Sequence, residues 1–420
     1  MATSAKDAII TQKRELESKW QEKYVERSSK LKGLEADLIK VIIGPRRSGK
    51  SFFAMHALRK AGNFGYVNFD DERLAQIKDF DEIMEAVNST YGNPKTLLLD
   101  EIQNVDKWEL LANRLQRQRI NLVITGSNSN LLSMELASHL TGRHLQILLF
   151  PFSFKEINEL EKRDLTSAEL SGMFGKYMEN GGYPEPYVKN VNRSDYLLTL
   201  FDAIIYKDIV KRFKIRNPIK VENTAIYLIS NVAREFSYGS LAEAAGLGST
   251  LTAQKYLGYL EGAFLLLTIR KYSPKAKETL SSNKKIYCID NGFISAKALK
   301  SSPDFGRLLE NVVAVELARQ GMEGKGEVFY WKNAQQEEVD FLVKKGTKIE
   351  RLIQVCFDVS NKKTKEREVR ALLKASKELK CKELIVITEG YEGRETTEWF
   401  GLKGEVKFIP AWKWLLEEKV

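Results

Sequence analysis

The chain has 420 residues, of which 43% are hydrophobic and 29% are charged, with 27 Gly and only 9 Pro. This composition excludes a disordered, collagen-like or low-complexity protein, and at roughly 150 residues per domain the length predicts two or three domains. The 66 Lys and Arg residues outnumber the 56 Asp and Glu residues, and the net charge of +10 favours a polyanionic partner.

The cysteines, the histidines and the first residues bear on metal binding and location. The three cysteines and three histidines are scattered, so they cannot form a Cys/His zinc framework, and so few thiols indicate a reducing compartment. The first 20 residues carry three acids and no apolar core, unlike a signal peptide. No apolar run approaches the ~20 residues that cross a bilayer. We therefore expect a soluble cytoplasmic protein with no membrane partner.

The predicted elements begin with an amphipathic helix over residues 4–30, where apolar residues recur at three- and four-residue steps. Short runs of Val, Ile and Leu then alternate with helical patterns as far as Pro151. Such alternation indicates an α/β domain with a parallel sheet that is covered on both faces. The strands are expected at 38–43, 64–69, 96–99, 121–125 and 145–150, and the helices between them at 51–60, 80–87 and 108–116.

The most specific motif is a glycine-rich turn between the first strand and the following helix. Its eight residues fit the pattern G-x-x-x-x-G-K-[ST] and are Gly44, Pro45, Arg46, Arg47, Ser48, Gly49, Lys50 and Ser51. Such turns surround the phosphates of ATP with backbone N–H groups, and the start of the helix adds its positive dipole end. We expect Lys50 to contact the terminal phosphates and the Ser51 hydroxyl to complete a Mg²⁺ shell. Arg46 and Arg47 either contact phosphate or pair with the acids at 70–72, and we expect an ion pair for at least one of them.

Two adjacent acids, Asp100 and Glu101, end the apolar strand at 96–99. Alone, such a pair is also typical of a solvated strand end. Beside a phosphate-binding turn, we expect Asp100 to hold Mg²⁺ through its water and Glu101 to orient and deprotonate an attacking water. The next strand delivers Ser127 and Asn128 to the same carboxyl edge, and one of the two would contact the γ-phosphate or that water.

Four motifs between residues 34 and 157 resemble those of the AAA-type ATPases of archaea and bacteria. They are the glycine-rich turn, Leu-Leu-Leu-Asp-Glu-Ile-Gln-Asn-Val, Ile-Thr-Gly-Ser-Asn-Ser, and Leu-Thr-Gly-Arg-His followed by Phe-Pro-Phe-Ser-Phe-Lys-Glu-Ile. The resemblance implies that Asp100 and Glu101 are the Mg²⁺-binding and catalytic acids, and that the polar residue after the fourth strand senses the γ-phosphate. Arg143 resembles the position that offers an arginine to the transferring phosphate, within the chain or from a neighbouring subunit of a homo-oligomer. Its alternative role is to cap a helix end.

Residues 236–289 have the element order of a winged helix-turn-helix. A short helix, a glycine turn and a longer helix are followed by two strands with a basic loop between them. Exposed residues of the longer helix, such as Lys255, would then face a DNA groove, while the loop contacts phosphates. The same order also serves protein–protein or spacer modules. The fused architecture of the AAA-type family includes a winged helix at this place.

The C-terminal part of the chain resembles the restriction-endonuclease-like domain of unknown function that is fused to these ATPases. That fold places a Glu on the first helix, an Asp on the second strand and a Glu-x-Lys on the third. Glu310 and Asp340 match, but Gln354 replaces the acid and Cys356 the lysine. A second site of Glu310, Asp340 and Gln354 would lack charge for Mg²⁺ and a lysine for the phosphate, so we expect weak or absent cleavage. Lys365, displaced onto the next helix, is an alternative source of the lysine.

The sequence thus predicts five segments and one main function. The segments are an N-terminal helix (1–33), a P-loop ATPase domain (34–151), a helical lid or linker (152–220), a winged helix-turn-helix (221–300) and a restriction-endonuclease-like domain (301–420). The main hypothesis is a Mg²⁺-dependent ATPase whose nucleotide state moves a DNA-associated C-terminal half. The alternatives are an ATP-regulated, structure-specific DNA nuclease and a nucleotide switch that recruits a protein partner.

Overall fold

A computed structural model describes residues 4–75, 79–126, 143–299, 302 and 304–417, and the chain forms two compact units. The first unit consists of Met1–Pro151, Pro184–Asn190 and Gly262–Phe264. The second unit consists of Phe152–Tyr183, Val191–Glu261 and Leu265–Val420.

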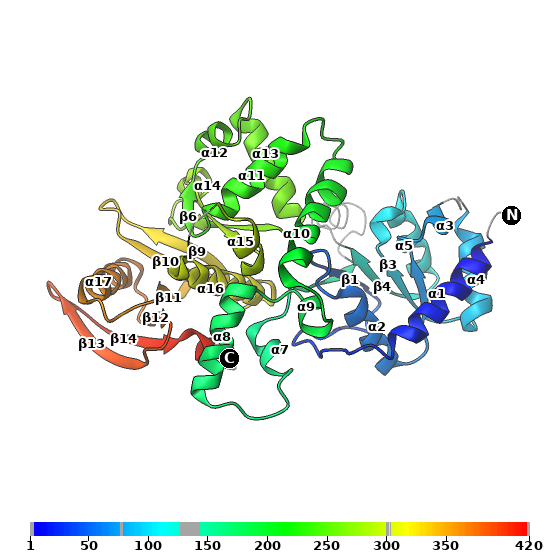
Figure 1. Cartoon of the computed structure of the whole chain (residues 1–420), viewed down its shortest axis with the longest axis horizontal. Coiled ribbons are helices and arrows are strands. Elements are labelled where there is room, and N and C mark those ends of the chain that lie inside the picture. Colours follow the sequence, from blue (N-terminus) through cyan, green and yellow to red (C-terminus); the bar gives the residue numbers. More distant parts are fainter. Residues whose placement is uncertain (1–3, 76–78, 127–142, 300–301, 303, 418–420) are drawn as a thin grey trace. The chain divides into compact units, whose positions relative to one another are not determined.

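A five-stranded parallel sheet in the order β2-β3-β4-β1-β5 forms the centre of the first unit (Figure 1). Val, Ile and Leu fill these strands because both faces of a parallel sheet are buried. Each strand begins and ends within two residues of its prediction, and the α/β class with a parallel sheet is confirmed. The strands are β1 (Ile39–Ile43), β2 (Gly65–Asn68), β3 (Thr96–Asp100), β4 (Asn121–Gly126) and β5 (His144–Leu148).

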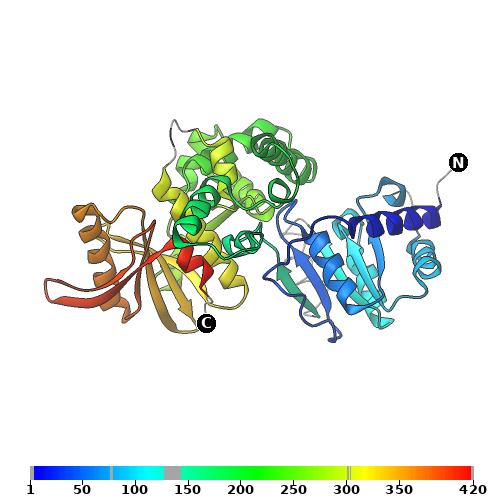
Figure 2. The same ribbon diagram turned by 60° about the horizontal axis from the view of Figure 1, so that its bottom comes forward.

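Helices cover both faces of this sheet, because successive residues of a strand point to opposite sides. In β1, Val41 packs in a core with the helices of one face, and Ile42 packs in another core with α2. Figure 2 shows α1, in dark blue, along one side of the unit. The helices of the first unit are α1 (Ala5–Lys19), α2 (Lys50–Ala61), α3 (Glu72–Ala75), α4 (Phe80–Tyr91), α5 (Trp108–Arg117) and α9 (Glu185–Val188).

The N-terminal helix is shorter than predicted, because aromatic residues that follow it pack on α2 instead of continuing the helix. Helix α1 ends at Lys19, and the Trp20 and Tyr24 rings lie 5.4 and 3.8 Å from the ring of His56. The segment after α1 is therefore an irregular strap across α2, and Arg27 in this strap is buried.

A single mixed sheet of nine strands, in the order β13-β14-β12-β11-β10-β9-β7-β8-β6, forms the centre of the second unit. The parallel pairing of β7 with β9 joins strands that we expected in two separate domains. The winged-helix segment and the C-terminal segment therefore share one sheet. The strands are β6 (Arg234–Phe236), β7 (Leu266–Lys271), β8 (Lys284–Cys288), β9 (Glu327–Lys332), β10 (Glu338–Lys345), β11 (Lys348–Cys356), β12 (Leu384–Thr388), β13 (Gly393–Trp399) and β14 (Leu402–Pro410).

Helix α17 packs its apolar side on the strands from β10 to β14, and Figure 2 shows it in orange beside the red β13–β14 hairpin. The sequence pattern did not predict this hairpin, because β13 alternates half-buried and exposed residues without an apolar run. Among the described helices, none is both long and apolar enough to cross a membrane. The helices of this unit are α7 (Phe154–Asn158), α8 (Ser167–Asn180), α10 (Arg193–Ala203) with a π-helical continuation (Ile204–Lys211), α11 (Pro218–Ser230), α12 (Tyr238–Ala244), α13 (Thr250–Gly262), α14 (Ala276–Ser281), α15 (Asn291–Lys297), α16 (Phe305–Met322), α17 (Lys362–Leu379) and α18 (Ala411–Leu416).

A buried carboxylate at the start of α15 holds the turn at residues 180–184 through hydrogen bonds. The Oδ2 atom of Asp290 accepts a hydrogen bond from the Gly182 N–H (2.6 Å), and Oδ1 accepts one from the Gly292 N–H (2.9 Å). Burial raises the pKa of Asp290 to about 7, against the opposing effect of these two donors. Ionisation of Asp290 therefore disfavours the folded state.

We expect the Asp290→Asn variant to gain stability relative to the wild type as the pH rises from about 4 to about 7. Over this range the carboxyl of the unfolded wild type ionises while the buried carboxyl keeps its proton, which lowers the free energy of unfolding. The amide does not titrate, and the difference should reach on the order of 4 kcal/mol. Urea unfolding across this pH range measures it. The exposed Asp202→Asn substitution is the control and should show no such trend. A pH-independent difference for Asp290→Asn would contradict the raised pKa.

Candidate functional site

The glycine-rich turn lies at the carboxyl end of β1 and leads directly into α2. Gly44, Arg47 and Gly49 have positive φ values of 153°, 63° and 89°. A Cβ atom on Gly44 would lie 2.1 Å from the carbonyl oxygen of Leu149, so a side chain has no space there. The N–H groups in the first turn of a helix have no intrahelical partner, and here they border the turn. This local geometry suits a phosphate group.

Two buried polar side chains, Lys50 and Ser48, lie within the turn. The ammonium of Lys50 donates to the carbonyl oxygens of Gly44 (3.1 Å) and Pro45 (2.8 Å). The Ser48 hydroxyl is buried and has no hydrogen-bond partner in the part of the chain that the structure describes. A buried polar group without a partner costs about 1–3 kcal/mol. A ligand rich in oxygen acceptors, such as a triphosphate, would supply that partner.

The carboxylate of Asp100, at the end of β3, joins three hydroxyl groups from different elements. Ser51 donates to its Oδ1 atom (2.9 Å), Thr125 donates to the same atom, and Tyr66 donates to Oδ2 (3.1 Å). Burial and the negative charge of Asp100 raise the pKa of Tyr66 far above its usual range, so this phenol remains a donor. A carboxylate beside a serine hydroxyl is a donor set that fits Mg²⁺ in the presence of a nucleotide. Ser51 and Asp100 are thus brought together, as the motif predicted.

Sequence reasoning missed Thr125 and Tyr66. Thr125 closes an apolar run at the carboxyl edge of the sheet, and this position was a usable signal. Tyr66 is one of several apolar or aromatic residues of a buried strand, so no sequence pattern marked it as part of the site.

Glu101 directly follows Asp100 and has a left-handed backbone conformation with φ 52°. Its N–H donates to the Thr125 hydroxyl (3.1 Å), and its carboxylate accepts a hydrogen bond from the Gln103 side chain. A non-glycine residue in this conformation is costly and is often found at active sites. The two acids therefore lie where the carboxyl ends of β1, β3 and β4 meet. Ser127 and Asn128 lie outside the described residues.

The described position of Arg143 differs from the role that the resemblance implied within one chain. Its carbonyl oxygen accepts a hydrogen bond from the Ile39 N–H (3.0 Å), at the start of β1. Since β1 and β5 are parallel, Arg143 precedes the sheet at the edge opposite the phosphate-binding turn, about 20 Å away at 3.3 Å per residue. Contact with a phosphate from a neighbouring subunit stays a prediction.

The exposed Arg47 forms an ion pair that was not predicted. Its guanidinium lies 3.0 Å from the carboxylate of Glu185, not against the acids at 70–72. Asp71 instead pairs with Arg73 at 2.7 Å, and hydrogen bonds from Arg73 and Gln12 lower the pKa of Asp71 to about 2 despite its partial burial. Arg47 therefore does not form the ion pair with these acids that was expected for at least one of the two arginines.

Arg27, in the strap after α1, supports the phosphate-binding turn by a hydrogen bond to its backbone. Its guanidinium donates to the carbonyl oxygens of Ser48 (2.8 Å) and Phe150 (2.6 Å), and the residue is 6% exposed. It links the strap, the turn and the chain that leaves β5. No motif marked this residue, because the contacts join segments that are far apart in the sequence.

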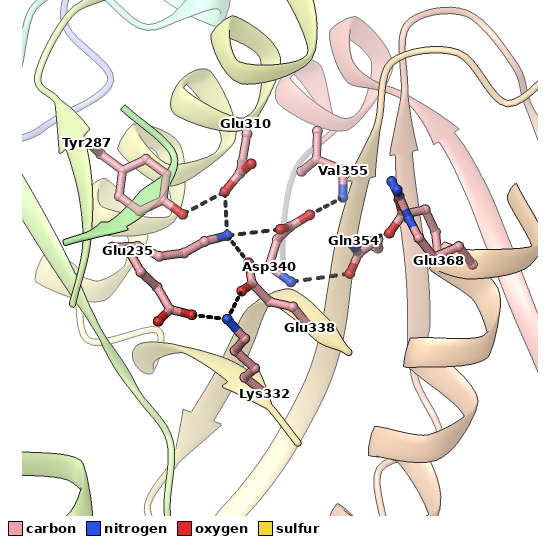
Figure 3. A network of polar contacts seen from close by, with 11 residues as sticks. Glu235, Tyr287, Glu310, Lys332, Glu338, Asp340, Gln354, Val355 and Glu368 are labelled. Atoms are coloured by element: carbon pink, nitrogen blue, oxygen red, sulfur yellow. Dashed lines mark hydrogen bonds and ion pairs between the residues drawn. The ribbon is translucent and has the colours of Figure 1, made fainter. Parts of the chain in front are cut away.

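A cluster of buried charges lies in the second unit, around Lys285 of β8 (Figure 3). The ammonium of Lys285 contacts Glu310 of α16 at 2.8 Å and two residues of β10, Glu338 at 2.6 Å and Asp340 at 3.0 Å. The predicted pair of Glu310 and Asp340 is thus brought together through a lysine. Lys285 is a charged residue in a buried strand, and this was a signal that sequence reasoning did not use.

Gln354 of β11 joins the cluster through its amide. Its Oε1 atom accepts from the Asp340 N–H (3.2 Å), and its Nε2 atom donates to Glu368 of α17 (2.6 Å). An acid is therefore present near the third strand, but it is Glu368 of helix α17. The Gln354 side chain bridges Glu368 and Asp340 by hydrogen bonds.

The lysine of the cluster comes neither from position 356, where the family pattern has it, nor from Lys365. Cys356 has a buried thiol whose pKa burial raises to about 11, so it remains uncharged. Lys365 pairs with Glu395 at 2.5 Å. The lysine is supplied by β8, from a segment that we had assigned to the winged helix.

Burial controls the charge states of this cluster. Burial and the charge of Asp340 raise the pKa of Glu310 to about 7, and burial also raises the pKa values of Glu338 and Glu368. Burial alone would lower the pKa of Lys285, but Glu310 and the other nearby acids raise it well above its usual range. The ammonium is therefore charged at neutral pH. A pocket of about 560 Å³ opens beside the cluster, and its lining includes Arg307, Arg367 and Arg370.

Comparisons with known proteins match three consecutive segments of the chain. Residues 36–158 match an AAA domain family, residues 172–304 a domain of unknown function (DUF8612), and residues 305–413 another (DUF4143). An uncharacterized protein of Methanocaldococcus jannaschii is 36% identical over an alignment of 397 residues that covers 90% of this chain and 88% of that protein. An uncharacterized protein of Haemophilus influenzae is 31% identical over 350 residues, covering 77% and 84% of the two chains. The solved Walker-type ATPase of Pyrococcus abyssi is 15% identical with a TM-score of 0.43, covering 63% of this chain and 91% of that chain.

A parallel sheet with a phosphate-binding turn after its first strand, and acids after a neighbouring strand, defines a P-loop nucleotide-binding protein. The chain belongs to a family of AAA-domain proteins in which two domains of unknown function follow the AAA domain.

We expect the Arg27→Met substitution to weaken ATP binding by about tenfold, because the turn loses two hydrogen bonds that fix its carbonyl groups. Isothermal titration with ATP and Mg²⁺ measures the dissociation constant. Arg14→Met, an exposed arginine on α1, is the matched control and should bind ATP like the wild type. Unchanged ATP affinity in a folded Arg27→Met protein would show that Arg27 does not position the turn.

Proposed function

We propose that this protein is a Mg²⁺-dependent ATPase whose nucleotide state acts on a DNA-associated second unit. The observation that carries the ATPase half is the meeting of Lys50, Ser51 and Asp100 at one edge of the sheet, with Ser51 and Asp100 2.9 Å apart. These are the groups that phosphoryl transfer needs, since its catalysis is mainly positioning and neutralisation of charge.

Each residue of the site has a distinct role in this proposal. The N–H groups of the turn hold the phosphates, and Lys50 exchanges its carbonyl partners for the terminal phosphates. Ser51 and Asp100 hold Mg²⁺, which when bound neutralises charge on the phosphates. Glu101 accepts a proton from the attacking water. Hydrogen bonds with Thr125 and Gln103 hold Glu101 in place.

We expect Lys50→Ala to abolish measurable ATP turnover, and Glu101→Gln to bind ATP but lower kcat by about 10²–10⁴-fold, as for loss of a general base. Phosphate release and ATP titration measure the two properties separately. Lys60→Ala, a solvent-exposed lysine of the same helix, is the control and should keep wild-type turnover. Wild-type turnover by Lys50→Ala would show that the site is assigned wrongly.

The DNA half of the proposal is supported by the net charge of +10 and by the element order around α13. Helices α12 and α13 precede the antiparallel strands β7 and β8, and β6 pairs with β8, as in a winged helix-turn-helix. Lys255 and Gln254 are exposed on α13, the helix that would enter a groove.

We expect duplex DNA binding to weaken steeply with salt, and Lys255→Ala to lower the log–log salt slope by about 1 through loss of one phosphate contact. Fluorescence anisotropy at several salt concentrations, with and without ATP, measures this. Lys377→Ala, an exposed lysine on α17, is the control and should keep the wild-type slope. Absence of salt-dependent DNA binding would favour the nucleotide switch that recruits a protein partner.

A further inference from the structure

Three carboxylate oxygens converge on the ammonium of Lys285 from two different elements. The distances from Nζ are 2.6 Å to Glu338, 2.8 Å to Glu310 and 3.0 Å to Asp340, and the Lys285 side chain is 3% exposed. Charged hydrogen bonds between nitrogen and oxygen have lengths of about 2.7–2.9 Å, whereas oxygens around Mg²⁺ lie about 2.0–2.1 Å from the ion. The oxygens are therefore spaced around a nitrogen cation.

Two of the three carboxylates, Glu310 and Asp340, also accept a hydrogen bond from a second protein donor, and a second ammonium lies near the third. Glu310 accepts from the Tyr287 hydroxyl (2.8 Å), Asp340 accepts from the Val355 N–H (3.0 Å), and Glu338 lies 3.8 Å from the ammonium of Lys332. Figure 3 shows these contacts on all sides of the cluster. A divalent ion that binds water or a phosphate needs open coordination positions. Besides Lys285, protein donors already occupy oxygens of Glu310 and Asp340.

The cation and its carboxylates come from different family segments. Lys285 lies within the segment that matches one domain of unknown function (172–304), and all three carboxylates lie within the next (305–413). Both segments belong to the second unit. The cluster is therefore complete only when the first segment supplies its lysine. Among the described residues, no group of three or more acids, histidines or cysteines is arranged to hold a metal ion.

We propose that the ammonium of Lys285 is the resident cation of the cluster formed by Glu310, Glu338 and Asp340, in the place that a divalent metal ion would take among them. The cluster is then a metal site only after Lys285 is removed. This inference goes beyond the proposed function. It bears on the weak or absent DNA cleavage that the sequence predicts, and it stands independently of ATP hydrolysis.

The test is a Mn²⁺ titration of the full chain, followed by the electron paramagnetic resonance signal of the free ion. All proteins carry Asp100→Asn, so that the nucleotide site does not contribute bound Mn²⁺. We expect Lys285→Met to bind one Mn²⁺ at least about tenfold more tightly than the parent protein, because three carboxylates lose their cation. Lys332→Met is the matched control, since it removes a cation from the edge of the same cluster, and it should behave like the parent.

Two outcomes would overturn the proposal. One is a folded Lys285→Met protein that binds Mn²⁺ no better than the parent. The other is a parent protein that binds one Mn²⁺ which Asp340→Asn removes, since the metal would then coexist with Lys285. The second comparison does not require the Lys285 variant to fold, and equal Mn²⁺ binding by the parent and Asp340→Asn supports the proposal. ATP turnover is measured separately on proteins that retain Asp100, so failure of this inference is distinguishable from failure of the proposed ATPase.

Discussion

The chemistry of the first unit depends on the parallel pairing of β1, β3 and β4, which ends all three strands at one edge of the sheet. Ile43 lies beside Gly126, and Leu99 beside Ile124, so the turn after β1 and the ends of β3 and β4 reach the same level. Because side chains alternate along a strand, a shift of one residue in β3 would turn Asp100 to the other face. The buried Val, Ile and Leu residues that fix this register therefore also place the carboxylate beside Ser51 and Thr125.

The second unit depends on a different constraint, the compensation of buried charge. Several acids are buried around one pocket, and buried carboxylates are costly unless they are paired and hydrogen-bonded. Lys285 provides the pairing, the Val355 N–H donates a hydrogen bond to Asp340, and the Gln354 amide donates one to Glu368. The parallel pairing of β7 with β9 connects the hairpin that carries Lys285 to the strands that carry the acids. Two segments of unknown function are thus joined by a shared sheet and by a shared charge network.

The parts of the fold that could be predicted rest on local patterns. Apolar runs predicted the strands of the first sheet, and helical periodicity predicted α2, α4 and α5, because each pattern lies within one element. The length of α1 and the hairpin β13–β14 could not be predicted in this way. The first depends on aromatic packing against His56, and the second on pairing of a strand that carries no apolar run.

The candidate sites likewise combine residues that local sequence patterns predict with residues that only long-range contacts bring into place. The phosphate-binding turn and the acids Asp100 and Glu101 were evident in the sequence, since backbone conformation and residue type act there over a few neighbouring positions. Arg27, Thr125 and Lys285 acquired their roles only in the tertiary structure, because their partners lie 21 to 123 residues away in the chain. The order of residues therefore determined which ligand the first unit is built to hold. Packing alone decided what supports that site and which cation lies among the acids of the second.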